Sequence, residues 1–205
     1  MKNAVYLLFP YPVMVCAENY AFSSAEKQFI SELEMINNTG NLMSSNETIL
    51  HSEELSDLKL FVEKQLLVYK KNLLRMQDEN TIYITQSWVN HSDPEHFHHK
   101  HKHPNSVISG VMFFDENNDG SLPPIRFHRS LDMFPLEFEF DDLNESNSDC
   151  RSFETVQGSL ILFPSLLEHD VAINRSDRTR TSISFNTFVR GAIGRREKLT
   201  EVDIS

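Results

Sequence analysis

The chain has 205 residues, of which 40% are hydrophobic and 24% are charged, and its formal net charge at pH 7 is −11. These values are typical of a globular protein with one sizeable core, and the acidic charge argues against general binding to nucleic acid or anionic lipid. No apolar run approaches the roughly 18 residues of a membrane span. The two cysteines, Cys16 and Cys150, are far apart and read as free thiols of a reducing compartment, so we expect a cytoplasmic protein.

The first 40 residues predict an edge strand and a helix. Residues 1–15 are apolar but interrupted by Pro10 and Pro12, which indicates a bent edge strand and not a signal peptide. Ser23 and Glu26 then form a capping box at the start of a helix. Its apolar positions are Phe29, Ile30, Leu33 and Ile36, and the polar residues at 37–40 are expected to end it.

A second helix is predicted after Ser52, its expected N-cap. Apolar residues recur there at steps of three and four, as on the buried face of an amphipathic helix. They are Leu55, Leu58, Val62, Leu66, Tyr69, Leu73 and Met76. We expect both helices to lean on the outside of a sheet.

From residue 80 onward the pattern changes to short strands, which favours a sandwich, a jelly roll or a cupin-like barrel. The predicted strands are residues 81–88, 107–114, 123–128, 136–140, 152–157, 158–163, 169–173 and 181–189. The acidic stretch 141–149 is predicted to be a surface loop.

A histidine cluster precedes the strand predicted at 107–114. Six of the nine histidines lie within thirteen residues, at positions 91, 96, 98, 99, 101 and 103. Neutral imidazole is the commonest protein ligand of iron, zinc and copper, so this cluster is a candidate metal site. Taken alone, it is equally compatible with a surface tract that chelates metal without function.

Three polar residues downstream complete a second pattern. His169 follows the strand predicted at 158–163, and Arg180 and Ser182 open the last strand. Burying an arginine is costly without an anionic partner, and its forked donors match a carboxylate. Ser182 points to the same face of the strand as Arg180 and can add a hydroxyl group to the same oxygen. An exposed arginine paired with a surface acid is the alternative.

The order of these residues resembles the iron(II)- and 2-oxoglutarate-dependent oxygenases, and in particular a group known largely from marine bacteria and their phages. The resemblance spans nearly the whole chain and rests on residues 87–90, on the His101-x-His103-Pro104-Asn105-Ser106 motif through Gly110, and on residues 158–186. It also takes in residues 9–12 and 41–46.

This resemblance implies a mainly β fold with N-terminal helices and a double-stranded β-helix core. It implies an oxygenase domain over residues 1–205, with support at 1–79, the core at 80–190 and a C-terminal tail at 191–205. The implied cofactors are Fe(II), the cosubstrate 2-oxoglutarate and O2. The implied metal ligands are His101, His103 and His169, with Arg180 and Ser182 binding the distal carboxylate of 2-oxoglutarate.

One residue departs from the family pattern, because His103 stands where the wider superfamily has a carboxylate. A three-histidine site is the interpretation that we favour, since Pro104 biases His103 toward an extended backbone and Asn105-Ser106 can turn the chain into the next strand. Ligation by His99 and His101, or by a carboxylate from Glu95, Glu168 or Asp170, stays open. His99, Asn105 and Asn186 are candidates for the surroundings of the ligands.

The expected activity is hydroxylation of a peptide or small molecule, with release of succinate and CO2. The alternatives are a cupin-like metal-binding module and a three-histidine metalloenzyme that does not use 2-oxoglutarate. Zinc hydrolysis is disfavoured because the HExxH and CxxC patterns are absent from the sequence. The sequence leaves the substrate open, and it leaves open whether the protein is a homodimer.

Overall fold

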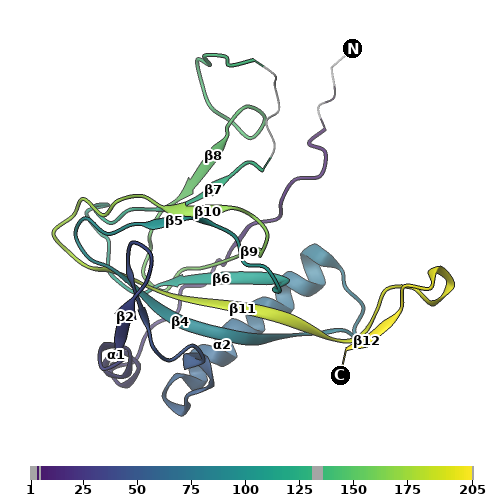
Figure 1. Cartoon of the computed structure of the whole chain (residues 1–205), viewed down its shortest axis with the longest axis horizontal. Helices are drawn as coiled ribbons and strands as arrows, with labels where there is room; N and C mark the ends of the chain where they lie inside the picture. Colours follow the sequence, from purple (N-terminus) through teal and green to yellow (C-terminus); the bar gives the residue numbers. More distant parts are fainter. Residues whose placement is uncertain (1–3, 5, 131–135, 205) are drawn as a thin grey trace.

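The computed structural model describes residue 4 and residues 6–130 and 136–204. Two antiparallel sheets face each other, and the helices lie against the outer face of the larger one (Figure 1). This arrangement is the predicted double-stranded β-helix with N-terminal helices, so the expected fold class is confirmed. Within the described residues, no helix is long and apolar enough to cross a bilayer.

The larger sheet is eight-stranded in the described part of the chain. Its order is β1 (Met14–Val15), β9 (Leu160–Pro164), β6 (Ile108–Phe113), β11 (Arg180–Ile193), β4 (Thr81–Ser92), β3 (Leu42–Ser44) and β2 (Met35–Asn37), with β12 (Val202–Ile204) paired to β11. The smaller sheet has the order β5 (His98–His101), β10 (His169–Val171), β7 (Ile125–His128) and β8 (Cys150–Phe153).

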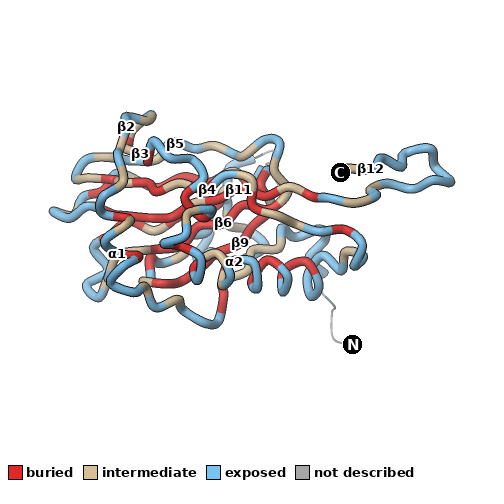
Figure 2. Tube along the Cα trace, turned by 90° about the horizontal axis from the view of Figure 1, so that it is seen from below, coloured by how far each residue is buried: buried red, intermediate tan, exposed pale blue. Residues whose placement is uncertain are grey.

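The helices bury their apolar stripe on the larger sheet. They are α1 (Ser24–Ser31) and α2 (Ser56–Val68), with the 3-10 turns η1 (Ile49–His51), η2 (Glu53–Leu55) and η4 (Arg196–Lys198) and the π-helix η3 (Tyr69–Leu74). Leu58, Val62 and Leu66 of α2 pack with Ile183 and Phe185 of β11 in one core. Figure 2 shows this buried layer between α2 and the strands. The predicted packing of the helices on the outside of the sheet is confirmed.

Side-chain alternation gives the larger sheet two different faces. On the inner face, Val111 and Phe113 of β6 pack with Phe127 of the smaller sheet in a second core. On the outer face, the ring of Phe185 packs directly against the backbone of Gly110. A side chain at position 110 would collide with this ring. The candidate site residues Arg180 and Ser182 lie on the inner face, between the sheets.

One predicted boundary near the N-terminus is confirmed and others differ. The second helix begins at Ser56, after the 3-10 turn η2, and its expected N-cap Ser52 makes no side-chain cap hydrogen bond. The capping box of Ser23 and Glu26 is present. The edge strand is reduced to Met14–Val15, paired with β9; part of the predicted segment, residues 1–3 and 5, lies outside the described residues. The first helix ends at Ser31, not near 37, because Ile36 belongs to a β2–β3 hairpin whose turn contains Gly40 at φ +86°.

The strand predicted at 136–140 is also wrong. Its residues form no regular structure and are exposed. The acidic stretch 141–149 is a loop, as expected. Strand β5 was not predicted, since its four residues are histidine and lysine and carry no apolar alternation. Beyond residue 190, where we expected a tail, β11 continues and pairs with β12.

Candidate metal centre

Three histidines meet between the two sheets. His101 ends β5, His169 begins β10, and the two residues face each other in the antiparallel pair β5–β10. His103 follows in the next loop, where its backbone N–H donates to the carbonyl of Ser165 at 2.8 Å. One ligand nitrogen from each ring lies within 4.8 Å of the others. The structure therefore brings together the three residues that the sequence analysis favours as ligands.

Hydrogen bonds fix the orientation of two of these rings. Nδ1–H of His101 donates to the carbonyl of His99 at 2.7 Å, and Nδ1–H of His169 donates to the carbonyl of Leu167 at 2.9 Å. A carbonyl can only accept, so the proton is on Nδ1 in both rings. The Nε2 lone pairs are then free for a metal ion, which is the usual arrangement of metal-binding histidines.

Burial keeps the three imidazoles neutral. It lowers the pKa of His169 to about 3 and the pKa of His103 to about 4, with a smaller contribution from the neighbouring ring of His101. Burial also lowers the pKa of His101. Neutral imidazole is the form that binds metal, so these donors are ready to coordinate at neutral pH.

The alternative carboxylate ligands do not join this group. Asp170 receives two hydrogen bonds from Arg126, at 2.7 and 2.8 Å. Glu95 pairs with Arg175 at 2.6 Å. In the described part of the chain, the three histidines are the one group of three or more potential metal ligands.

His98 is a neighbour of the cluster that the sequence analysis did not select. Its ring stacks on that of His101, with centroids 4.4 Å apart and an interplanar angle of 21°. Residues 98 and 101 of a regular strand would point to opposite faces, but the pairing of β5 with β10 shifts register between them. That irregular register turns both rings inward. The sequence contains no pattern from which it could be predicted. Burial lowers the pKa of His98 to about 2.

Arg180 lies on the inner face of β11 and is 2% exposed. Its Nε donates to the carbonyl of Pro123 at 3.0 Å, and its Nη1 lies 3.4 Å from Oγ of Ser182. Nη2 is buried and has no hydrogen-bond partner. Burial lowers the pKa of the guanidinium to about 10, although Asp115 nearby opposes the shift. A buried cation with an unused donor is a site for an anion.

The three residues expected around the ligands differ in their placement. His99 is exposed, with Nδ1 3.5 Å from the carbonyl of Thr39. Asn105 is an exposed turn residue at φ +59°, so it shapes the loop after His103. Asn186 is buried, and its Oδ1 accepts a hydrogen bond from Ser109 at 2.8 Å. Ser109 lies 2.9 Å from Ser165, whose carbonyl holds the His103 backbone.

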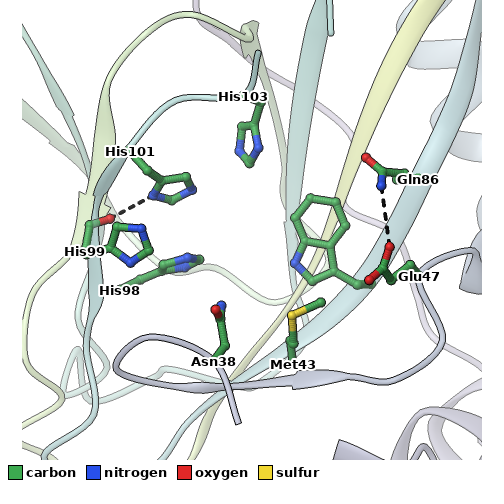
Figure 3. A pocket seen from close by; sticks show the side chains of 9 residues that line it. Asn38, Met43, Glu47, Gln86, His98, His99, His101 and His103 are labelled. Carbon is green, nitrogen blue, oxygen red and sulfur yellow. Dashed lines mark hydrogen bonds between the residues drawn. The ribbon is translucent and has the colours of Figure 1, made fainter. Parts of the chain in front are cut away.

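A cavity of about 270 Å³ opens beside the histidines. Figure 3 shows His98, His99 and His101 on one side of it, with Gln86 and Glu47 opposite and Asn38 and Met43 below. Its lining residues are Asn38, Met43, Glu47, Gln86, Trp88, His98, His99, His101 and His103. The candidate ligands His101 and His103 therefore face a space that can admit a small molecule or a side chain.

Residues 86–186 match a family model described as "Putative 2OG-Fe(II) oxygenase". A search of curated proteins found no match.

Solved structures of such oxygenases share the fold. An oxidoreductase of the 2OG-Fe(II) oxygenase family from Burkholderia pseudomallei is 12% identical, with a TM-score of 0.59 over 85% of this chain and 83% of that one. HygX from Streptomyces hygroscopicus, crystallised with nickel, 2-oxoglutarate and hygromycin B, is 11% identical, with a TM-score of 0.59 over 85% and 82%. A prolyl-4-hydroxylase from Pseudomonas putida is 16% identical, with a TM-score of 0.56 over 86% and 92%.

Proposed function

We propose that this chain, whose residues 86–186 belong to the 2OG-Fe(II) oxygenase family, hydroxylates a peptide or a small molecule with Fe(II), 2-oxoglutarate and O2. The observation that carries the proposal is Arg180, a buried arginine whose Nη2 has no partner. It lies on the inner face of β11, over the ring of Phe113 in the core between the sheets, and His101 and His169 belong to the smaller sheet opposite. A metal-binding module without a cosubstrate would not need this cation.

The donor set fits Fe(II). Three neutral imidazoles from His101, His103 and His169 would leave three positions of an octahedral ion open, two for 2-oxoglutarate and one for O2. When bound, iron and 2-oxoglutarate supply the oxidising chemistry, in which one oxygen atom enters the substrate and the other enters succinate as CO2 is released. The histidines hold the ion without adding negative charge, so the site favours a dianionic cosubstrate.

Arg180 and Ser182 would anchor the distal carboxylate of 2-oxoglutarate. The guanidinium donates to the carbonyl of Pro123, and its unpaired Nη2 and the hydroxyl group of Ser182 would both donate to one carboxylate. The guanidinium carbon of Arg180 lies 5.4 Å from the centroid of the Phe113 ring, which belongs to the apolar core between the sheets. A dry, prearranged cation binds a carboxylate more strongly than an exposed one.

The extent of the domain and its location belong to the same proposal. We take residues 80–190 as the catalytic core, supported by residues 1–79, within one domain over residues 1–205. Cys16 and Cys150 are both free thiols, which agrees with a reducing cytoplasm.

The test is an anaerobic titration with Fe(II) and then 2-oxoglutarate, followed by the visible metal-to-ligand charge-transfer band of the chelate. We expect the band in the wild type and a weakening of 2-oxoglutarate binding by about a hundredfold in Arg180→Ala, since a buried charged hydrogen-bonding pair is lost. Arg180→Lys keeps the positive charge but loses the paired donors of the guanidinium group. Its affinity for 2-oxoglutarate should therefore lie between those of the wild type and Arg180→Ala. Arg178→Ala is the matched control, because Arg178 lies two residues earlier and binds exposed Asp119.

An iron-loaded wild type without a band at saturating 2-oxoglutarate would refute the proposal. The three-histidine set would then belong to a metalloenzyme or a metal-binding module that does not use 2-oxoglutarate. Circular dichroism of each variant shows whether it is folded, so that a lost band is not mistaken for a lost fold.

A further inference from the structure

The cavity contains a carboxylate that is not one of the candidate metal ligands. Among its nine lining residues there is no lysine or arginine, and Glu47 supplies the one carboxylate. Figure 3 shows Glu47 beside Gln86, across the cavity from His98, His99 and His101. A ligand that reaches from the metal to this wall therefore ends at a negative charge.

Backbone contacts fix the position of Glu47. Its carbonyl accepts the N–H of Ser87 at 2.8 Å, and the next residue, Thr48, forms a bridge with Ser87. Its carboxylate has a weak contact of 3.5 Å with Nε2 of Gln86. No lysine or arginine of the described ranges lies within 4.0 Å of it. Glu47 therefore lies beside β4, and its exposed carboxylate pairs with no lysine or arginine in the part of the chain that the structure describes.

The rest of the lining suits an aliphatic chain. Trp88 is held by a hydrogen bond from Nε1 to Oδ1 of Asn90 at 3.2 Å, and Asn90 is held in turn by Ser184. The indole ring lies 5.9 Å from the ring of His103, between centroids. Together with the thioether of Met43 it gives an apolar surface near the histidines. The indole face also attracts cations.

We propose that the substrate is an aliphatic chain that ends in an ammonium or guanidinium group. Its methylene groups would lie on Trp88 and Met43, and its cationic end would pair with Glu47. A C–H bond of the chain would then face the three histidines. This assignment deepens the proposed function and rests on it, because it takes the cavity beside the histidines as the substrate site.

The fluorescence of Trp88 provides a binding assay independent of turnover, because it is the single tryptophan of the chain. The full-length protein is loaded with 2-oxoglutarate and with Zn(II), a redox-inactive ion that accepts the same imidazole donors. It is titrated with L-lysine and L-arginine, and with their neutral counterparts L-norleucine and L-citrulline. Nα-acetyl-L-lysine amide is included to distinguish a peptide side chain from a free amino acid.

We expect lysine or arginine to change the fluorescence, and the neutral counterpart to bind at least about fivefold more weakly, as for a partly exposed charge pair. Glu47→Gln should abolish this preference and its salt dependence. Glu54→Gln, an exposed glutamate outside the lining, should keep both. Binding of the capped lysine would identify a peptide side chain, and binding of free lysine alone would identify the amino acid.

Equal binding of the charged and neutral probes, no response to any cationic probe, or an unchanged preference in Glu47→Gln would overturn the inference. The charge-transfer titration distinguishes this failure from failure of the proposed function. A wild type that shows the band but does not prefer cations is an oxygenase with a different substrate.

Discussion

The two faces of β11 differ although both are buried. The outer face carries Ile183 and Phe185 into the core beneath the helices. The inner face carries Arg180, Ser182 and Asn186 toward the histidines. Apolar burial on the outer face stabilises the fold, whereas the inner face places polar groups where apolar ones would stabilise more. Stability and the proposed function would thus depend on opposite sides of one sheet.

The largest expected effect is on the outer face. Phe185→Ala should lower the free energy of unfolding by about 4 kcal/mol, because a fully buried aromatic ring is replaced by a cavity. The charge-transfer titration of the folded variant should be unchanged. Urea unfolding measures the free energy of unfolding. Ser184→Ala, which alters the adjacent inward side chain, is the control, and its free energy of unfolding should stay within about 1 kcal/mol of the wild-type value. A loss of the band in folded Phe185→Ala would contradict the division.

The second prediction tests whether the three histidines between the sheets bind a metal ion. Zn(II) at about a hundredfold excess over its dissociation constant should raise the free energy of unfolding by about 2.7 kcal/mol, because it binds the native state. At the same concentration, the increase should be lost in His169→Ala and kept in His51→Ala, whose histidine is exposed and remote from the cluster. Stabilisation of both variants to the same extent would place the metal elsewhere.

The buried histidines predict a pH dependence of the metal-free protein. Burial lowers the pKa of His98 to about 2 from its ordinary value of 6.5, so below pH 6.5 the unfolded chain binds more protons than the native one. The free energy of unfolding should therefore fall as the pH falls from 6.5. His98→Gln should reduce the fall in this free energy between pH 6.5 and 5.5 by about 1 kcal/mol, measured by urea unfolding at the two pH values. His51→Gln is the control, and equal slopes in the wild type and His98→Gln would contradict the prediction.

The smallest effect concerns one hydroxyl group. Ser182→Ala should weaken 2-oxoglutarate binding about fivefold, the usual value of a single hydrogen bond, and leave stability almost unchanged. The charge-transfer titration measures the affinity. Thr179→Ala, an exposed hydroxyl group bound to Asp93, is the matched control. A variant that binds 2-oxoglutarate as the wild type does would show that Arg180 anchors it without Ser182.

Local chemistry in the sequence is enough to predict several features. The capping box of Ser23 and Glu26 depends on residues three positions apart, and the apolar stripe of α2 repeats along one helix. The alternation along β11 separates the residues of its two faces before any partner strand is known. His101, His103 and His169 could be selected because their types and order resemble those of a known family.

Other features depend on contacts between distant segments. Ile36 leaves the predicted helix because β3 offers it a strand partner, and His98 turns inward because β10 imposes an irregular register on β5. Glu47 reaches the cavity because its backbone is bound to Ser87, 40 positions later in the chain. Sequence alone determined the α2 stripe, the capping box and most of the core strands, since local periodicity encodes them, and the order of the histidines pointed to the candidate ligands. Only the tertiary structure decided which other side chains surround the site, because pairing between distant strands sets their direction.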